Sequence, residues 1–147
     1  MEYKKIISKQ LGQILIEKGI ITEEELKKAL EIQKQSGELI GRILVGLGYA
    51  TEEGIAQALT VQYGFPFLSL LNYDIDSQIA SIIPKNMAEQ YGLIAIDKIG
   101  NTLTVAMSNP LNTSAIEDLE MLTKHKIQIF IATMTDIIDA ISRAYKK

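Results

Sequence analysis

Hydrophobic positions in the first half of the chain recur at the three- and four-residue spacing of a helix, and the whole pattern occurs twice. Residues 11–33 read LGQILIEKGIITEEELKKALEIQ, and residues 40–62 read IGRILVGLGYATEEGIAQALTVQ. The two stretches align without a gap, and ten of their positions are identical. Such self-similarity indicates a duplicated supersecondary unit.

The glycines of the repeat predict where each first helix begins and ends. Gly19 and Gly48 fit the left-handed position just past a helix C-terminus, which glycine adopts at least cost. Gly12 and Gly41 are each expected near a helix start, ahead of an apolar run. A missing side chain there would let a backbone or a ligand approach closely.

Threonines predict the start of the second helix in each copy. Thr22 and Thr51 fit the N-cap position, and Glu25 completes a capping box with Thr22. The second copy has Gly54 in place of that glutamate. Its helix start should therefore be weaker by a fraction of about 1 kcal/mol. Each copy is predicted to be a helix-turn-helix.

The sequence GFPF at residues 64–67 ends the helical pattern, and Pro66 marks a boundary. We therefore expect a helical subdomain over residues 1–66 and an α+β subdomain over residues 67–147. In the second part, the apolar runs 93–97 and 102–107 flank a Gly-Asn turn, which is typical of a β-hairpin.

Further elements of the second part follow from caps and alternation. Residues 126–133 alternate as a strand does, and a helix over 84–90 follows a short turn. Two more helices are expected, one capped by Thr113 or Ser114 and one capped by Thr135 with Ile137, Ile138 and Ile141 on one face. The predicted fold class is α+β: an N-terminal duplicated helix-turn-helix bundle followed by a small three-stranded sheet with covering helices.

Composition excludes several kinds of chemistry. The 147 residues include no Cys and one His, so a disulfide framework, a zinc cluster and a cysteine nucleophile are excluded. The 15 Lys+Arg against 18 Asp+Glu give a net charge of −3, which argues against a nucleic-acid binder. The sequence contains no GxSxG, GxGxxG or GxxxxGK[ST] motif, so we expect a non-catalytic domain that is not itself a P-loop ATPase and holds no metal.

The N-terminal residues lack a signal-peptide core, and the apolar runs are far shorter than the roughly 20 residues needed to cross a bilayer. Together with the lack of Cys, this predicts a cytoplasmic location without a direct membrane span.

Three segments together resemble a known family. They are the duplicated unit, the stretch IIPKNMAEQYGLIAI at residues 82–96, and the loop AMSNPLN at residues 106–112. From about Lys9 to Tyr145, the chain resembles the N-terminal (MshEN-type) domain of the assembly ATPases of type II secretion and type IV pilus systems.

This resemblance implies a regulatory and docking domain ahead of a hexameric ATPase domain, coupling the motor to the inner-membrane platform protein. The location implied is the cytoplasmic side of the inner membrane, reached through partner proteins. The alternative is a sensor that binds cyclic di-GMP through the two repeats, as a subset of the family does. A third interpretation is a free-standing adaptor with the same fold. None of the three requires a cofactor in this chain besides cyclic di-GMP as a regulatory ligand.

The resemblance also implies which residues would contact cyclic di-GMP. They come from both repeats and from the AMSNPLN loop: Gln10, Leu11, Gly12, Leu15, Gln33, Leu39, Ile40, Gly41, Arg42, Leu44, Gln62 and Asn109. The family motif begins with Arg, where this chain has Gln10 and Leu39, and the loop acid of the family is Asn109 here. Arg occurs only at Arg42 and Arg143. Losing two guanidinium contacts, each worth about 1.5–3 kcal/mol, weakens the sensor interpretation and favours docking.

Overall fold

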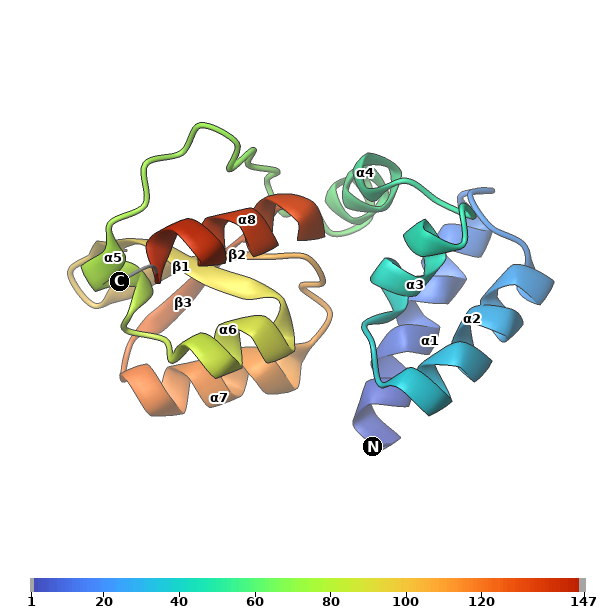
Figure 1. The fold of residues 1–147 in the computed structure, drawn as a ribbon, viewed down its shortest axis with the longest axis horizontal. Helices are drawn as coiled ribbons and strands as arrows, with labels where there is room; N and C mark the ends of the chain where they lie inside the picture. Colours follow the sequence, from blue (N-terminus) through green and yellow to red (C-terminus); the bar gives the residue numbers. More distant parts are fainter. Residues whose placement is uncertain (1, 146–147) are drawn as a thin grey trace. The chain divides into compact units, whose positions relative to one another are not determined.

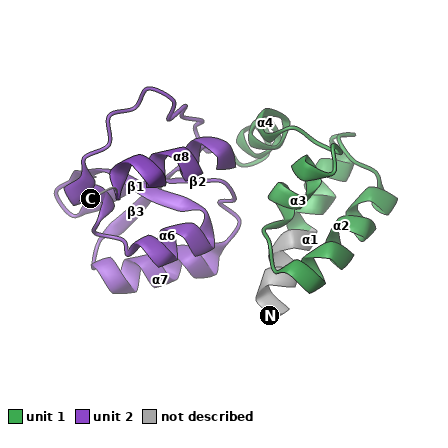
Figure 2. Cartoon of the chain, in the orientation of Figure 1, with its two compact units in different colours: residues 1–64 green, residues 65–147 purple. Residues whose placement is uncertain are grey.

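The computed structural model describes residues 2–145, with side chains from residue 10 on. The chain divides into two compact units that join between Gly64 and Phe65 (Figure 2). The boundary expected from sequence, after Pro66, lies two residues further along.

The first unit is built from the two helical repeats. Its elements are α1 (Glu2–Glu17), α2 (Glu23–Ser36), α3 (Ile40–Gly46) and α4 (Glu52–Tyr63). Helix α1 packs on α2 and α4, and α3 packs on α2 and α4. The equivalent leucines Leu15 and Leu44 are fully buried in the core, as is Leu59 of the second copy.

Helix α1 differs from the prediction because it begins at Glu2, far ahead of Gly12. Residues 2–11 contain no Gly or Pro, so nothing interrupts the helix before Gly12. In the second copy Gly37 ends α2 with a φ of 74°, and α3 then begins at Ile40. Gly41 is therefore near a helix start as expected, whereas Gly12 lies inside a helix.

The second unit contains a sheet with the strand order β1-β2-β3 within the described residues. Strands β1 (Leu93–Ile99) and β2 (Thr102–Met107) form the predicted antiparallel hairpin, with a bulge between Ala95 and Asp97. Gly100 adopts a φ of 58° in the turn, a conformation that favours glycine. Strand β3 (Lys126–Ile131) pairs in parallel with β2, and α7 (Thr113–Thr123) makes the crossover.

Helices cover the sheet of the second unit (Figure 1). Helix α8 (Met134–Ala144) packs on β1 and β2, while α5 (Ser77–Ala80) and α6 (Lys85–Tyr91) pack on β1. The strands β1 and β2 are buried along most of their length as a result. The predicted fold class is confirmed.

Two predicted caps of this unit are wrong. The N-cap of α7 is Asn112, whose Oδ1 accepts the N–H of Ala115 at 3.1 Å, in place of Thr113 or Ser114. The N-cap of α8 is Thr133, whose Oγ1 accepts the N–H of Asp136 at 3.2 Å, in place of Thr135. In both cases a second capping residue stands slightly earlier in the chain and lets the helix gain one or two residues.

Starting at Met134, α8 turns Ile137 and Ile141 into the core. Ile138 is 42% exposed, so its expected place on the same face is also wrong. At 100° per residue, a residue one step past Ile137 leaves the buried stripe.

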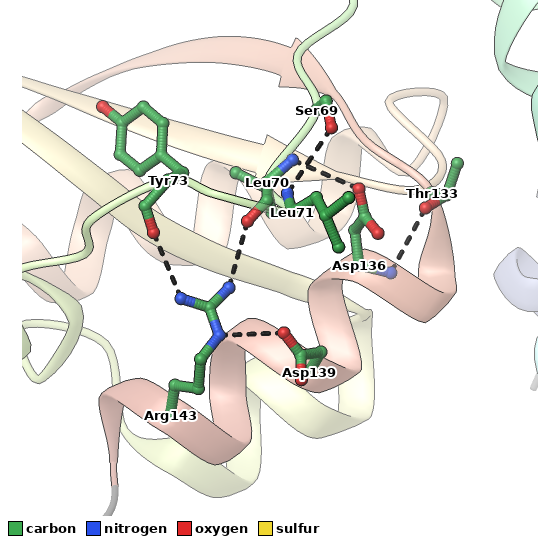
Figure 3. A network of polar contacts seen from close by, with 8 residues as sticks. All are labelled: Ser69, Leu70, Leu71, Tyr73, Thr133, Asp136, Asp139 and Arg143. Atoms are coloured by element: carbon green, nitrogen blue, oxygen red, sulfur yellow. Dashed lines mark hydrogen bonds and ion pairs between the residues drawn. The ribbon is translucent and has the colours of Figure 1, made fainter.

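Helix α8 also anchors the connecting segment, residues 65–76, through a polar network (Figure 3). The guanidinium of Arg143 donates to the carbonyl oxygens of Leu70 (3.0 Å) and Tyr73 (3.1 Å) and to Asp139 (2.8 Å). The carboxylate of Asp136 accepts the N–H of Leu70 at 3.2 Å. These bonds satisfy backbone groups of a segment without regular structure and hold Leu70 in the core, where it is fully buried.

The last described residue, Tyr145, ties the chain end to the α5–α6 region. Its hydroxyl lies 2.7 Å from the carbonyl oxygen of Ala80 and 2.6 Å from that of Ile83, and shares its proton between them. Burial, helped by the negative charge of Glu89, raises the pKa of Tyr145 to about 12. Burial and the charge of Asp97 also raise the pKa of Tyr73.

The raised pKa of Tyr145 predicts a loss of stability in alkali. Unfolding returns this pKa to about 10. The stabilisation that the protonated Tyr145 hydroxyl gives the folded state is therefore complete below pH 10 and is lost as the pH rises toward 12. Chemical denaturation between pH 8 and pH 12, followed by circular dichroism, measures this dependence. Tyr145→Phe should lose about 1–3 kcal/mol at neutral pH and then fall less steeply above pH 10. Equal slopes for both proteins would contradict the assignment.

Candidate functional site: the duplicated helical unit

The turns that end the first helix of each repeat have the same geometry. Gly19 and Gly48 have φ values of 75° and 79°. In the first copy the N–H of Ile20 donates to the carbonyl of Leu15 at 2.9 Å, and in the second the N–H of Tyr49 donates to that of Leu44 at 3.0 Å. This is the Schellman arrangement, and its hydrogen bonds fold each repeat back sharply after the first helix.

The helix starts after these turns differ as predicted. Thr22 accepts the N–H of Glu25 at 3.1 Å, and the Glu25 carboxylate accepts the N–H of Thr22 at 2.9 Å, which completes the capping box. In the second repeat Thr51 accepts the N–H of Gly54 at 3.0 Å, and position 54 has no side chain to return the bond. The two repeats therefore share the geometry of the turn but differ in how the start of the second helix is capped.

The ligand residues expected from sequence fall into two groups within the first unit. Four apolar residues form part of its core and are almost completely buried: Leu11, Leu15, Ile40 and Leu44. The exposed members are polar, namely Gln10, Arg42 and Gln62, while Leu39 and Gly41 are half-buried. Asn109 belongs to the second unit, where its Oδ1 accepts the N–H of Leu111 at 3.1 Å in the loop after β2.

The two motif glycines have different surroundings. A Cβ on Gly12 would lie 2.5 Å from Cδ2 and 3.0 Å from Cγ of Leu26, so a side chain there would force the buried Leu26 side chain of α2 to shift. The equivalent Cβ on Gly41 would lie 3.9 Å from Cδ1 of Ile55, an ordinary contact. Gly12 thus lies directly against a core side chain of α2, whereas Gly41 has room beside it. Leu26, which contacts Gly12, was not among the expected site residues. It is the fourth residue after the N-cap Thr22, the N4 position at which an apolar side chain packs as the hydrophobic staple, and it is buried.

The two motif glutamines also differ. Gln33 is 9% exposed, and its Nε2 donates to the carbonyl oxygen of Glu38 at 2.9 Å. This bond joins the end of α2 to the residue before the N-cap of α3. Gln62, at the equivalent position of the second repeat, is exposed. Although the two residues are identical in sequence, the Gln33 amide is buried and hydrogen-bonded within the unit, whereas the Gln62 side chain is exposed to solvent.

Among residues 10–145, no group of three His, Cys, Asp or Glu side chains is placed to hold a metal ion. No helix of the described part is long and apolar enough to cross a membrane. Among the expected ligand residues of the first unit, the exposed polar groups are the amides of Gln10 and Gln62 and the guanidinium of Arg42, which suit hydrogen bonding to a polar partner.

A family model for the MshEN domain matches residues 63–147. The chain belongs to the MshEN domain family. The match covers the second unit and the end of α4, so the repeats of this MshEN domain lie ahead of the matched region.

Curated relatives extend the likeness over the repeats. The type IV pilus assembly ATPase PilB of Myxococcus xanthus is 34% identical over 139 residues, which cover 95% of this chain and 25% of that protein. The type IV pilus assembly ATPase PilB of Thermus thermophilus is 30% identical over 147 residues, covering 99% of this chain and 16% of that protein. The chain thus spans a quarter or less of these relatives.

Solved structures confirm the fold. The structure of MshE with cdg, cyclic di-GMP, superposes with a TM-score of 0.68 and 30% identity, covering 92% of this chain and 98% of that one. The N-terminal domain of XpsE superposes with a TM-score of 0.69 at 15% identity, covering 93% and 94%. The expected membership of this family is confirmed, and the XpsE likeness shows the fold alone.

The unequal glycines predict opposite effects of the same substitution. Gly12→Ala should destabilise the first unit by roughly 1–2 kcal/mol, because overpacking costs about 1–3 kcal/mol and the gain in helix propensity offsets only part of it. Gly41→Ala should be neutral or stabilising by up to about 1 kcal/mol. Denaturant titration of both variants measures the difference. Equal effects of the two substitutions would contradict the packing assigned to Gly12.

Proposed function

We propose that this MshEN domain is the non-catalytic regulatory and docking module of a type IV pilus or type II secretion ATPase. In this role it couples a hexameric motor to the inner-membrane platform protein from the cytoplasmic side. The observation that carries the proposal is that 95% of the chain aligns with a quarter of a pilus assembly ATPase. The ATP-hydrolysing machinery would lie in the remainder of such a protein, because this chain has no P-loop motif.

The architecture supports a binding role. Both units bury dense apolar cores, and the sequence shows no motif that combines a nucleophile with a base. The connecting segment 65–76 is fastened to α8 by the Arg143 network, so the second unit presents a defined surface along this segment. A preorganised surface lowers the entropy cost of binding a partner.

Docking predicts that the platform protein recognises the ATPase through this domain. The cytoplasmic part of the platform protein should capture the full-length ATPase with micromolar affinity in a pull-down, followed by calorimetry. The matched control is the same ATPase lacking residues 1–147, which should keep its ATPase activity and lose the interaction. Capture of the truncated ATPase with unchanged affinity would place the docking site elsewhere and contradict the proposal.

A second candidate function is cyclic di-GMP sensing, favoured by the 30% identity with MshE, a structure that contains this ligand. Here the two repeats would bind the dinucleotide, and the twelve residues named from the motif stay a prediction. In the described structure the core leucines among them are closed to solvent, and the amide of Gln33 is bonded to Glu38. Binding would therefore require either an opening of the repeats or contacts made mainly by Gln10, Leu39, Arg42 and Gln62.

The missing arginines make the sensing hypothesis testable by restoration. Gln10→Arg combined with Leu39→Arg should increase the affinity for cyclic di-GMP by at least tenfold, because a charged hydrogen bond contributes about 1.5–3 kcal/mol. Isothermal titration calorimetry measures the affinity of the original and the double variant.

The control for this titration is Gln13→Arg, which adds a guanidinium at an exposed position of the same helix outside the motif. It should leave the affinity unchanged. If the double variant binds no better than this control, or if neither binds, the repeats do not form the dinucleotide site.

A further inference from the structure

One end of the sheet in the second unit combines exposed apolar side chains with lysines. This end, the hairpin–α7 tip, consists of residues 98–102 around the β1–β2 turn and residues 121–126 between α7 and β3. The N–H of Lys126 donates to the carbonyl oxygen of Asn101 at 2.8 Å, and Lys126 pairs with Thr102. The two segments are therefore neighbours at the same end of the sheet, as Figure 1 shows.

The apolar side chains of the tip point into solvent. Ile99 is 73% exposed, Met121 is 76% exposed and Leu122 is 50% exposed. Exposed apolar side chains that occur singly need no explanation, but here three of them come together from two adjoining segments. Their exposure is costly in water and is recovered when the tip is covered.

The charge of the tip opposes the charge of the whole chain. Its two segments contain Lys98, Lys124 and Lys126 and no acidic residue, whereas the chain has a net charge of −3. The nearest acids in sequence, Asp97 and Glu120, lie one residue outside the segments. With these two acids counted the net charge of this end of the sheet is +1, and its lysines beside apolar side chains are complementary to a surface that is anionic and has an apolar interior.

The backbone at Lys124 gives an independent indication. This residue caps α7 with a φ of 61° and is the one non-glycine with a positive φ among the described residues. The helix ends at Gly19, Gly37, Gly48, Gly64 and Gly92 use glycine for the same left-handed position. The left-handed conformation is less favourable for lysine than for glycine. The cationic side chain at the tip therefore lowers the local stability of this helix end.

We propose that the hairpin–α7 tip binds the surface of an anionic lipid bilayer. Ile99, Met121 and Leu122 enter the boundary between headgroups and acyl chains, while the lysines remain at the level of the headgroups with their aliphatic stems alongside. The tip is formed by a turn and a helix end that adjoin at one end of the sheet. This contact is independent of the platform protein and would add a second membrane-side attachment to docking.

Binding to vesicles tests the charge requirement. The 147-residue chain should co-sediment with vesicles of phosphatidylglycerol and phosphatidylethanolamine, not with phosphatidylcholine vesicles, and raised salt should release it. Lys98→Gln combined with Lys126→Gln should weaken partitioning by about fivefold for each lysine, which corresponds to roughly 1 kcal/mol per lysine. The control Lys27→Gln with Lys28→Gln removes the same charge from exposed positions of α2 and should bind normally.

Lys124→Gly separates lipid binding from folding. Glycine suits the left-handed cap, so this variant should show a higher midpoint temperature than the original chain and weaker vesicle binding. A purely structural role for Lys124 would not combine these two results. An increase in stability with unchanged vesicle binding would overturn the role assigned to this lysine.

Because the chain has no Trp, a single introduced Trp reports insertion directly. The fluorescence of Ile99→Trp should shift to the blue on addition of anionic vesicles. Leu71→Trp, at a 67% exposed position of the connecting segment, should not shift.

Absence of vesicle binding, or equal loss in the tip and α2 variants, would overturn the proposal. Tip-dependent binding to an acidic amphipathic peptide without vesicle binding would also overturn it and would assign the tip to a protein partner. Because the vesicles contain no platform protein, these outcomes leave the docking proposal unaffected.

Discussion

The first unit depends on a backbone hydrogen bond that closes each helical repeat across a left-handed glycine. In both copies the N–H after the glycine reaches the carbonyl five residues earlier, at 2.9 Å and 3.0 Å. This sharp reversal lets the second helix of each repeat fold onto the first, and the equivalent residues Leu15 and Leu44 of the two first helices are fully buried. The capping threonines, the apolar staple and the close contact at Gly12 all operate on helices whose relative direction the reversal has set.

The second unit contains a small sheet in which most of β1 and β2 is buried, so its strands need cover from other elements. Helices supply the cover. The connecting segment, residues 65–76, leads into the first of these helices, and its backbone bonds to β3 involve Pro66 and Leu68. The side chains of α8 provide further partners through Arg143 and Asp136, and the hydroxyl of Tyr145 does the same for the α5–α6 region. Polar groups of one helix thus complete the hydrogen bonding of irregular chain that lies far away in sequence.

Features governed by neighbours in sequence could be predicted, and features governed by distant contacts could not. The capping box at Thr22, the glycine turns and the β-hairpin follow local rules, and all are present. The interior position of Gly12 and the amide bond from Gln33 to Glu38 depend on how far α1 extends and where α3 begins. The caps at Asn112 and Thr133 were missed because several capping residues stand in a row, and the buried face of the helix decides among them. For the candidate ligand residues, the motif identified equivalent positions in the two repeats. It did not indicate which of these side chains are buried in the core and which are exposed.

The single-sided cap of the second repeat has a consequence for motion. Glu25 closes the first turn of α2 on both sides, whereas Gly54 leaves the N–H of Thr51 without that carboxylate and adds the backbone freedom of glycine. The first turn of α4 is therefore the less protected of the two helix starts, and its amides should exchange with solvent hydrogen faster than those of α2. If the repeats open, we therefore expect the first turn of α4 to unfold before the first turn of α2.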